Sequence, residues 1–119
     1  MPWNLSNDRP IYLQIVELLG RRILAGKYNS GDRFPTVREL AAEASVNPNT
    51  MQKALQELER KGLLITNRTT GRTITEDEEL IDKLRKEFAN ECLADFQKEM
   101  NELGYSNESL LSFVKENLT

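Results

Sequence analysis

Two helix-start signals lie close together in the middle of the sequence, and they constrain the fold more than any other feature. Thr36 is followed by Glu39 at the spacing of a capping box, in which each side chain can reach the other's backbone N–H. Asn47 is followed by Pro48, a pair that suits the cap and first position of a second helix. Two capped helices joined by a tight turn, the second ending near Gly62, predict a helix-turn-helix.

The apolar residues around these signals recur at spacings of three and four, as on the buried face of a helix. An earlier helix is predicted from Pro10, which suits the first helical turn, to a stop near Gly26. The expected core positions are Ile11, Ile15, Leu18, Leu19 and Ile23 in this helix, Leu40, Ala41 and Ala44 in the next, and Met51, Ala54, Leu55 and Leu58 in the third.

After Gly62 the period changes from helical to strand-like. Residues 63–66 and 72–75 read as two short strands, and 67–71 is a polar turn between them. A hairpin directly after a helix-turn-helix is a wing. The predicted fold class is therefore mainly α with a small β-hairpin: an N-terminal winged helix-turn-helix, followed by a short two-helix tail.

The tail begins with an acidic run at 76–79, favourable at a helix N-terminus, and carries a long apolar stripe that ends at Gly104. Ser106 can cap a final helix. Two helices with broad apolar stripes cannot enclose a core alone, so we expect them to pack on a second copy of the chain. Folding back onto the winged domain is the alternative. The expected domains are 1–75 and 76–119, with dimerisation through Leu84, Phe88, Phe96, Met100, Leu110, Phe113 and Val114.

The charge is divided between these two parts. Residues 1–75 carry 11 lysines and arginines against 7 acidic residues, whereas residues 76–119 carry 5 against 12. The overall charge of −3 is therefore the sum of a basic half and an acidic half. The basic half suits phosphates, and repulsion keeps the acidic half away from them.

Cysteine and histidine usage limits the chemistry. The chain has one cysteine, Cys92, and no histidine, so a disulfide framework and a Cys/His zinc site are excluded. With no membrane-length apolar run and no signal peptide at the N-terminus, we expect a cytoplasmic protein. No cofactor and no resident metal are expected. A small effector at the interface between two copies is left open, as is a redox role for Cys92, although a small interface hydrophobe is the simpler interpretation.

The polar residues at the start of the third helix carry the predicted function, which is recognition of double-stranded DNA. Asn and Gln side chains can pair with adenine edges in the major groove, and Thr, Lys and Arg suit phosphates. A solvated helix face, a surface ion pair of Arg38 and solvent-exposed wing arginines are the alternatives. The candidate DNA-binding residues are Thr36, Arg38, Asn49, Thr50, Gln52, Lys53, Arg68, Gly71 and Arg72.

Residues 10–75 resemble the DNA-binding domain of the GntR family of bacterial regulators. The matching text is PIYLQI at 10–15, GDRFPTVRELA at 31–41, VNPNTMQKALQELERKGLL at 46–64, and the hairpin. The resemblance implies DNA contacts by Arg38, by the start of the third helix and by the wing. The wing departs from the family pattern, because a glycine and an aromatic residue are missing. Arg72 could compensate for them electrostatically.

The short tail resembles that of the YtrA-like subfamily. That resemblance implies a homodimer formed by the tail, repression of a two-fold operator, and genes beside a transporter operon. A winged-helix module that binds a protein instead of DNA is the competing hypothesis. An enzyme is not expected, because the carboxylates lie on solvated helix faces and no glycine-rich phosphate loop is present.

Overall fold

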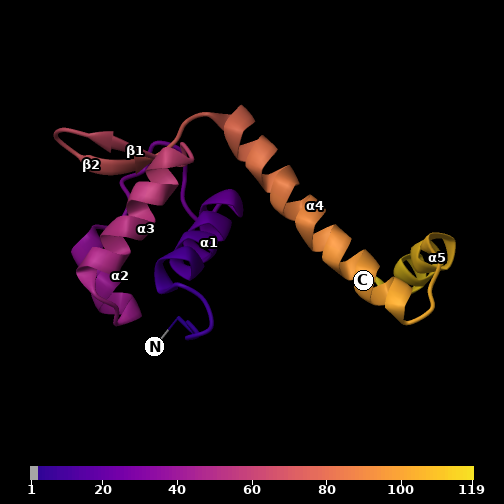
Figure 1. Ribbon diagram of the computed structural model, residues 1–119. Coiled ribbons are helices and arrows are strands. Elements are labelled where there is room, and N and C mark those ends of the chain that lie inside the picture. The colour runs from indigo at the N-terminus through magenta and orange to yellow at the C-terminus, as the bar shows by residue number, and fades with distance from the viewer. Residues whose placement is uncertain (1–2) are drawn as a thin grey trace. The chain divides into compact units, whose positions relative to one another are not determined.

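The computed structural model describes residues 3–119 and contains the predicted helices and hairpin (Figure 1). It divides into two compact units, one reaching to Asp82 and one running from Lys83 to Thr119. Each unit is described by itself. The elements are α1 (Ile11–Leu24), α2 (Val37–Ala44), α3 (Pro48–Arg60), β1 (Leu64–Asn67), β2 (Gly71–Ile74), α4 (Glu78–Glu102) and α5 (Asn107–Asn117).

Helix α1 starts one residue later than predicted, because Pro10 is its cap and not its first residue. The segment before it is tied down by Gln14, which is buried although polar. Its amide nitrogen donates to the carbonyls of Ser6 at 2.8 Å and Arg9 at 2.9 Å, and its oxygen accepts from the N–H of Ser6 at 2.9 Å. These hydrogen bonds satisfy the polar atoms of the Gln14 amide, so its burial costs little free energy.

The helix-turn-helix has both predicted caps. The hydroxyl of Thr36 accepts from the N–H of Glu39 at 3.1 Å, and the Oδ1 of Asn47 accepts from the N–H of Asn49 at 2.7 Å. The reciprocal bond of a full capping box, from Thr36 N–H to Glu39, is absent from residues 3–119. The turn between the helices places Ser45 in the left-handed region, at a φ of 57°.

The core of the first unit gathers around α3, which contacts α1, α2 and β1 (Figure 1). The predicted inner positions of α2 and α3 are all buried, whereas Ile11 and Leu18 of α1 are only half-buried. Gly20 of α1 faces α3, and a Cβ there would make ordinary contact with the Cδ2 of Leu58 at 3.8 Å. Phe34, Leu63, Leu64 and Ile74 join this core from the loop and the hairpin.

The wing is an antiparallel hairpin with Leu64 opposite Ile74 and Asn67 opposite Gly71. Each strand is shifted by one residue from the predicted range. The outer edge of β2 is covered, because Phe34 N–H donates to the carbonyl of Arg72 at 2.8 Å and Ile74 N–H donates to that of Asp32 at 2.8 Å. The chain before α2 therefore holds the wing like a third strand.

The second unit contains most of α4 and all of α5. Helix α4 begins at Glu78, two residues later than predicted, because Asp77 caps it by accepting from Leu80 N–H at 3.1 Å. Gly104, with a φ of +100°, ends α4 as expected. Ser106 caps α5 through the N–H of Ser109 at 3.1 Å, and Tyr105 packs edge-on against Phe113.

Candidate nucleic-acid interface

The N-terminus of α3 presents polar side chains on the side away from the core. Asn49 and Lys53 are exposed, and Thr50 and Gln52 are half-buried at its flanks. The adjacent residues Met51, Ala54 and Leu55 are buried, so the helix is oriented by its apolar face. Asn47 uses its side chain as a cap, as expected, and is not counted among the contact residues.

Helix α2 adds Thr36 and Arg38 next to this face. The hydroxyl of Thr36 already accepts the capping bond, while its side chain stays exposed. Arg38 is exposed and, within residues 3–119, forms no ion pair with Glu39 or Glu43. Its guanidinium therefore remains available for an external anion.

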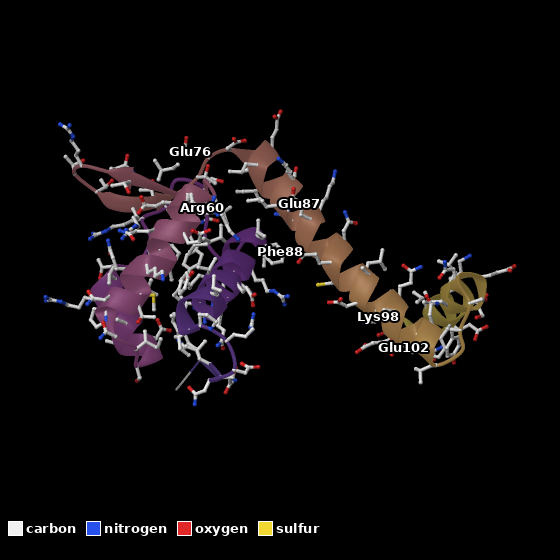
Figure 2. All side chains as sticks on the ribbon, viewed as in Figure 1. Arg60, Glu76, Glu87, Phe88, Lys98 and Glu102 are labelled. Carbon is white, nitrogen blue, oxygen red and sulfur yellow. The ribbon has the colours of Figure 1, made fainter. Side chains whose placement is uncertain are left out.

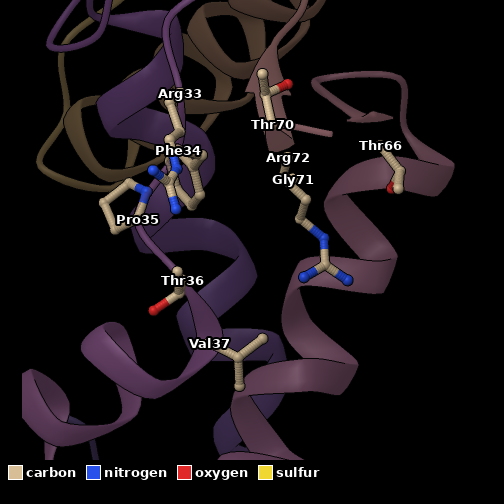
Figure 3. Close-up of a pocket in the computed structure, with 9 residues that line it drawn as sticks. All are labelled: Arg33, Phe34, Pro35, Thr36, Val37, Thr66, Thr70, Gly71 and Arg72. Carbon is tan, nitrogen blue, oxygen red and sulfur yellow. The ribbon is translucent and has the colours of Figure 1, made fainter. Parts of the chain in front are cut away.

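A groove of about 250 Å³ lies between the start of α2 and the wing (Figure 3). Its position follows from the pairing of Arg33 with Thr73, which brings the chain before α2 alongside β2. Arg33 is exposed and adds a cation to this wall. The groove is lined by Arg33, Phe34, Pro35, Thr36, Val37, Thr66, Thr70, Gly71 and Arg72.

The two wing arginines have different surroundings. Arg68 lies in the turn, is exposed, and has no ion-pair partner in the part of the chain that the structure describes. Arg72 is half-buried and extends from β2 towards α3 (Figure 3). There it forms an ion pair with Glu59. Gly71 is exposed and has a φ of +78°, which the turn requires and most side chains would resist.

Glu59 itself is held as a carboxylate. Burial raises its pKa, but hydrogen bonds from Thr66 and Arg72, together with the charge of Arg72, outweigh that effect and leave the pKa below its ordinary value. The group is therefore ionised at neutral pH and neutralises part of the charge of Arg72.

Lys53 also has a partner. Its Nζ lies 3.9 Å from the ring centre of Tyr12 on α1, a cation–π contact. The ammonium is thus drawn towards α1 while it remains exposed. This contact joins α3, the predicted recognition helix, to α1 on the solvent side of the core.

The residues predicted for dimerisation fall into three groups. Met100 and Leu110 are buried within the single chain, at 8% and 7% exposure. Leu84, Phe88 and Val114 are half-buried, and Phe96 and Phe113 are exposed. The structure adds large apolar side chains outside that set, exposed on the second unit: Leu93, Leu103, Leu111 and Leu118.

Several residues of this surface were missed by sequence reasoning. Arg33 and Glu59 lie within the segments that resemble the GntR family, but their spacing predicts no site role, because their positions depend on strand pairing and on the fold of the hairpin onto α3. Tyr12 lies on the predicted first helix, but nothing in its spacing points to Lys53. Contacts between elements distant in sequence leave no periodic signal.

Two negative findings concern residues 3–119. No helix there is long and apolar enough to cross a membrane. No group of three or more histidine, cysteine, aspartate or glutamate side chains among them is arranged to hold a metal ion.

The sequence matches the family model of bacterial regulatory proteins of the gntR family over residues 11–74. This range contains α1, the helix-turn-helix and the wing. It therefore includes the proposed interface on α2, α3 and the hairpin.

Three known proteins illustrate the similarity. The uncharacterised HTH-type transcriptional regulator YhcF of Bacillus subtilis is 39% identical over 110 residues, which cover 92% of this chain and 91% of YhcF. The HTH-type transcriptional repressor YtrA of the same organism is 44% identical over 71 residues, covering 60% of this chain and 55% of YtrA. A solved GntR family regulator from Listeria monocytogenes has a TM-score of 0.84 at 38% identity, covering 94% of this chain and 98% of that one. The chain belongs to the GntR family and is a DNA-binding transcriptional regulator.

Proposed function

We propose that this protein is a homodimeric repressor that binds a two-fold symmetric operator. The observation that carries the proposal is the polar N-terminal face of α3, flanked by Arg38 and Arg68, which form no ion pair within residues 3–119. A helix that presents this face to the major groove reads bases with its amides while the flanking cations bind phosphates.

Each contact residue has a role that follows from its chemistry. Asn49 and Gln52 offer amides to adenine edges, and Thr50 suits a phosphate or a thymine methyl group. Thr36, Arg38 and Lys53 suit the phosphate backbone beside α3. In the wing, Arg68 and Gly71 allow a cation and bare backbone to approach the adjacent minor groove.

The tail supplies the two-fold symmetry in this proposal. Leu93, Leu103, Leu111 and Leu118 are between 58% and 78% exposed on the second unit. Burying such side chains against a second copy removes apolar surface from water at about 25 cal/mol per Å². An acidic surface, including Glu87 and Glu102 of α4 (Figure 2), keeps the dimerisation region off the DNA by repulsion.

Repression is supported by the relative YtrA, which is named a transcriptional repressor. A bound dimer blocks a promoter by occupying it, which requires no further domain. The similarity to YtrA also favours a target operon of the transporter class, which the resemblance to the YtrA-like subfamily implies. Expression of a reporter from the promoter of the gene that encodes this chain, with and without the protein, tests the direction of regulation. Expression that rises with the protein would contradict repression.

Selection of duplexes from a random pool by the full chain tests the operator. We expect an inverted repeat with half-site centres one helical turn apart, and binding that weakens steeply with salt. The double variant Arg38→Ala with Thr50→Ala should lose at least about tenfold in affinity. Binding that is indifferent to sequence, or unchanged in the double variant, would contradict the proposal and favour a protein-interaction module.

A further inference from the structure

Glu59 bonds to both strands of the wing from the last turn of α3. Its Oε2 accepts from the hydroxyl of Thr66 on β1 at 2.7 Å, and its Oε1 accepts from the Nε of Arg72 on β2. The side chains of Arg72 and Glu59 are only 18% and 28% exposed. Partial shielding from water strengthens a charge-assisted hydrogen bond compared with a fully exposed pair.

The strand register makes this double contact geometrically natural. Thr66 lies directly opposite Arg72 in the hairpin, so the two side chains emerge side by side on the same face. One carboxylate beneath that face can reach both. Asn67, one residue further, instead donates to the hydroxyl of Thr73 at 2.8 Å, which joins the strands to each other and not to the helix.

Backbone hydrogen bonds hold the outer edge of β2. Phe34 N–H donates to the carbonyl of Arg72, and the pair Arg33–Thr73 continues the ladder. The main chain of β2 is thereby fixed to the loop before α2, whereas Glu59 adds side-chain hydrogen bonds from α3 to the face of the hairpin. Among the described residues, the side-chain hydrogen bonds between α3 and the wing are those of Glu59.

We propose that Glu59 is a positioning residue that fixes the wing on the recognition helix, and that Arg72 serves this bond and does not contact phosphate. The inference rests on the proposed operator binding. The inference goes beyond operator binding because it gives the two wing arginines different roles. Arg68 binds DNA, and Arg72 fixes the position of the wing. Moving Arg72 onto a phosphate would leave an ionised carboxylate unpaired beside the DNA backbone, which electrostatics opposes.

Hydrogen exchange of the free full-length protein tests the positioning role. In Glu59→Ala and in Arg72→Ala, we expect the amides of 64–74 to exchange roughly fivefold to tenfold faster than in the wild type. Thr66→Val, which removes the hydroxyl while keeping the shape, should show a smaller change in the same direction. Glu57→Ala is the matched control, because Glu57 pairs with Arg60 on the same helix and not with the wing. Unchanged exchange of 64–74 in both Glu59→Ala and Arg72→Ala would overturn the inference.

The salt dependence of operator binding tests the role of Arg72. Losing one phosphate contact lowers the slope of log K against log salt by about 0.9 per wing. We expect that loss in Arg68→Ala, and in Arg72→Ala a severalfold weaker affinity with the wild-type slope. A slope that falls in Arg72→Ala as far as in Arg68→Ala would overturn the inference. If the wild type bound no duplex, the proposed function would fail, while the exchange experiment would still decide whether Glu59 positions the wing.

Discussion

Ser45 holds a backbone conformation that its residue type disfavours. It is the C-cap that follows α2, at a φ of 57°, where the left-handed region brings Cβ close to the backbone. Val46 N–H donates to the carbonyl of Ala41 at 3.0 Å, so this conformation closes the helix and sets the turn to α3. The turn between α2 and α3 therefore contains a residue whose backbone conformation suits glycine better than serine.

Replacing Ser45 by glycine should relieve that strain. We expect Ser45→Gly to raise the free energy of unfolding by ~0.5–1 kcal/mol, measured by chemical denaturation. Ser45→Ala is the control, since it removes the hydroxyl while keeping a Cβ in the same conformation. An equal gain from alanine would show that the backbone is not the cause.

The ionisation of Glu59 leads to a second prediction. Its pKa is lowered in the folded chain from an ordinary value of 4.5, so its contribution to stability is complete at neutral pH and disappears as the pH falls through the folded pKa. The wild type should be ~0.5–1 kcal/mol more stable than Glu59→Gln at pH 7. This difference should vanish at acid pH, because a protonated glutamate resembles glutamine. Unfolding curves across pH check this, and a difference that persists unchanged to about pH 3 would refute it.

Among the elements, α1 and α3 respond differently to the same substitution of glycine by alanine. Gly20 lies inside α1, and an added Cβ would make ordinary contact with Leu58 at 3.8 Å. Gly62 follows α3 at a φ of +88°, and its added Cβ would lie 2.9 Å from Leu80. The first position favours alanine and the second excludes it.

We therefore expect Gly20→Ala to stabilise the fold by ~0.5–1 kcal/mol and Gly62→Ala to destabilise it by ~1 kcal/mol or more. The two variants control for each other, since the chemical change is the same. Thermal and denaturant unfolding measure both. A loss in Gly20→Ala would mean that α1 and α3 pack more tightly than the 3.8 Å distance indicates.

For the whole molecule, the exposed leucines of the second unit predict dependence on a second copy. Leu103 and Leu111 are 75% and 62% exposed, which is costly for a chain that remains a monomer. The double variant Leu103→Glu with Leu111→Glu should sediment as a monomer. The affinity of this variant for a duplex with two half-sites should fall by about 10²-fold, because the two DNA-binding domains are no longer joined in one molecule.

The matched control adds the same charges on the opposite faces of α4 and α5. Asn90→Asp with Ser112→Asp changes two exposed polar positions that lie away from the apolar stripes. This variant should stay dimeric and keep its affinity. If both double variants dissociated, acidity and not the apolar surface would be the cause. If the leucine variant stayed dimeric, the tail would not have the role proposed for it.

The sequence by itself determined the helices, the hairpin and the division into a basic and an acidic part. The caps at Thr36, Asn47 and Ser106 bond to backbone two or three residues away, so a local pattern is enough to locate them. Two helix starts differ from the pattern: α1 begins one residue later than predicted and has no side-chain cap, and α4 begins two residues later, after its cap Asp77. The local sequence limits each of these helix starts to a few residues but does not decide which residue is first.

Only the tertiary structure decided which side chains meet. Arg72 pairs with Glu59, and Met100 and Leu110 are buried within one chain, and the sequence pattern alone predicts neither arrangement. Arg33 borders the groove because its strand-like segment pairs with β2. These outcomes depend on how separate elements pack, and the burial and charge of the whole neighbourhood determine that packing. A linear pattern records spacing along one element and carries no information about its partner.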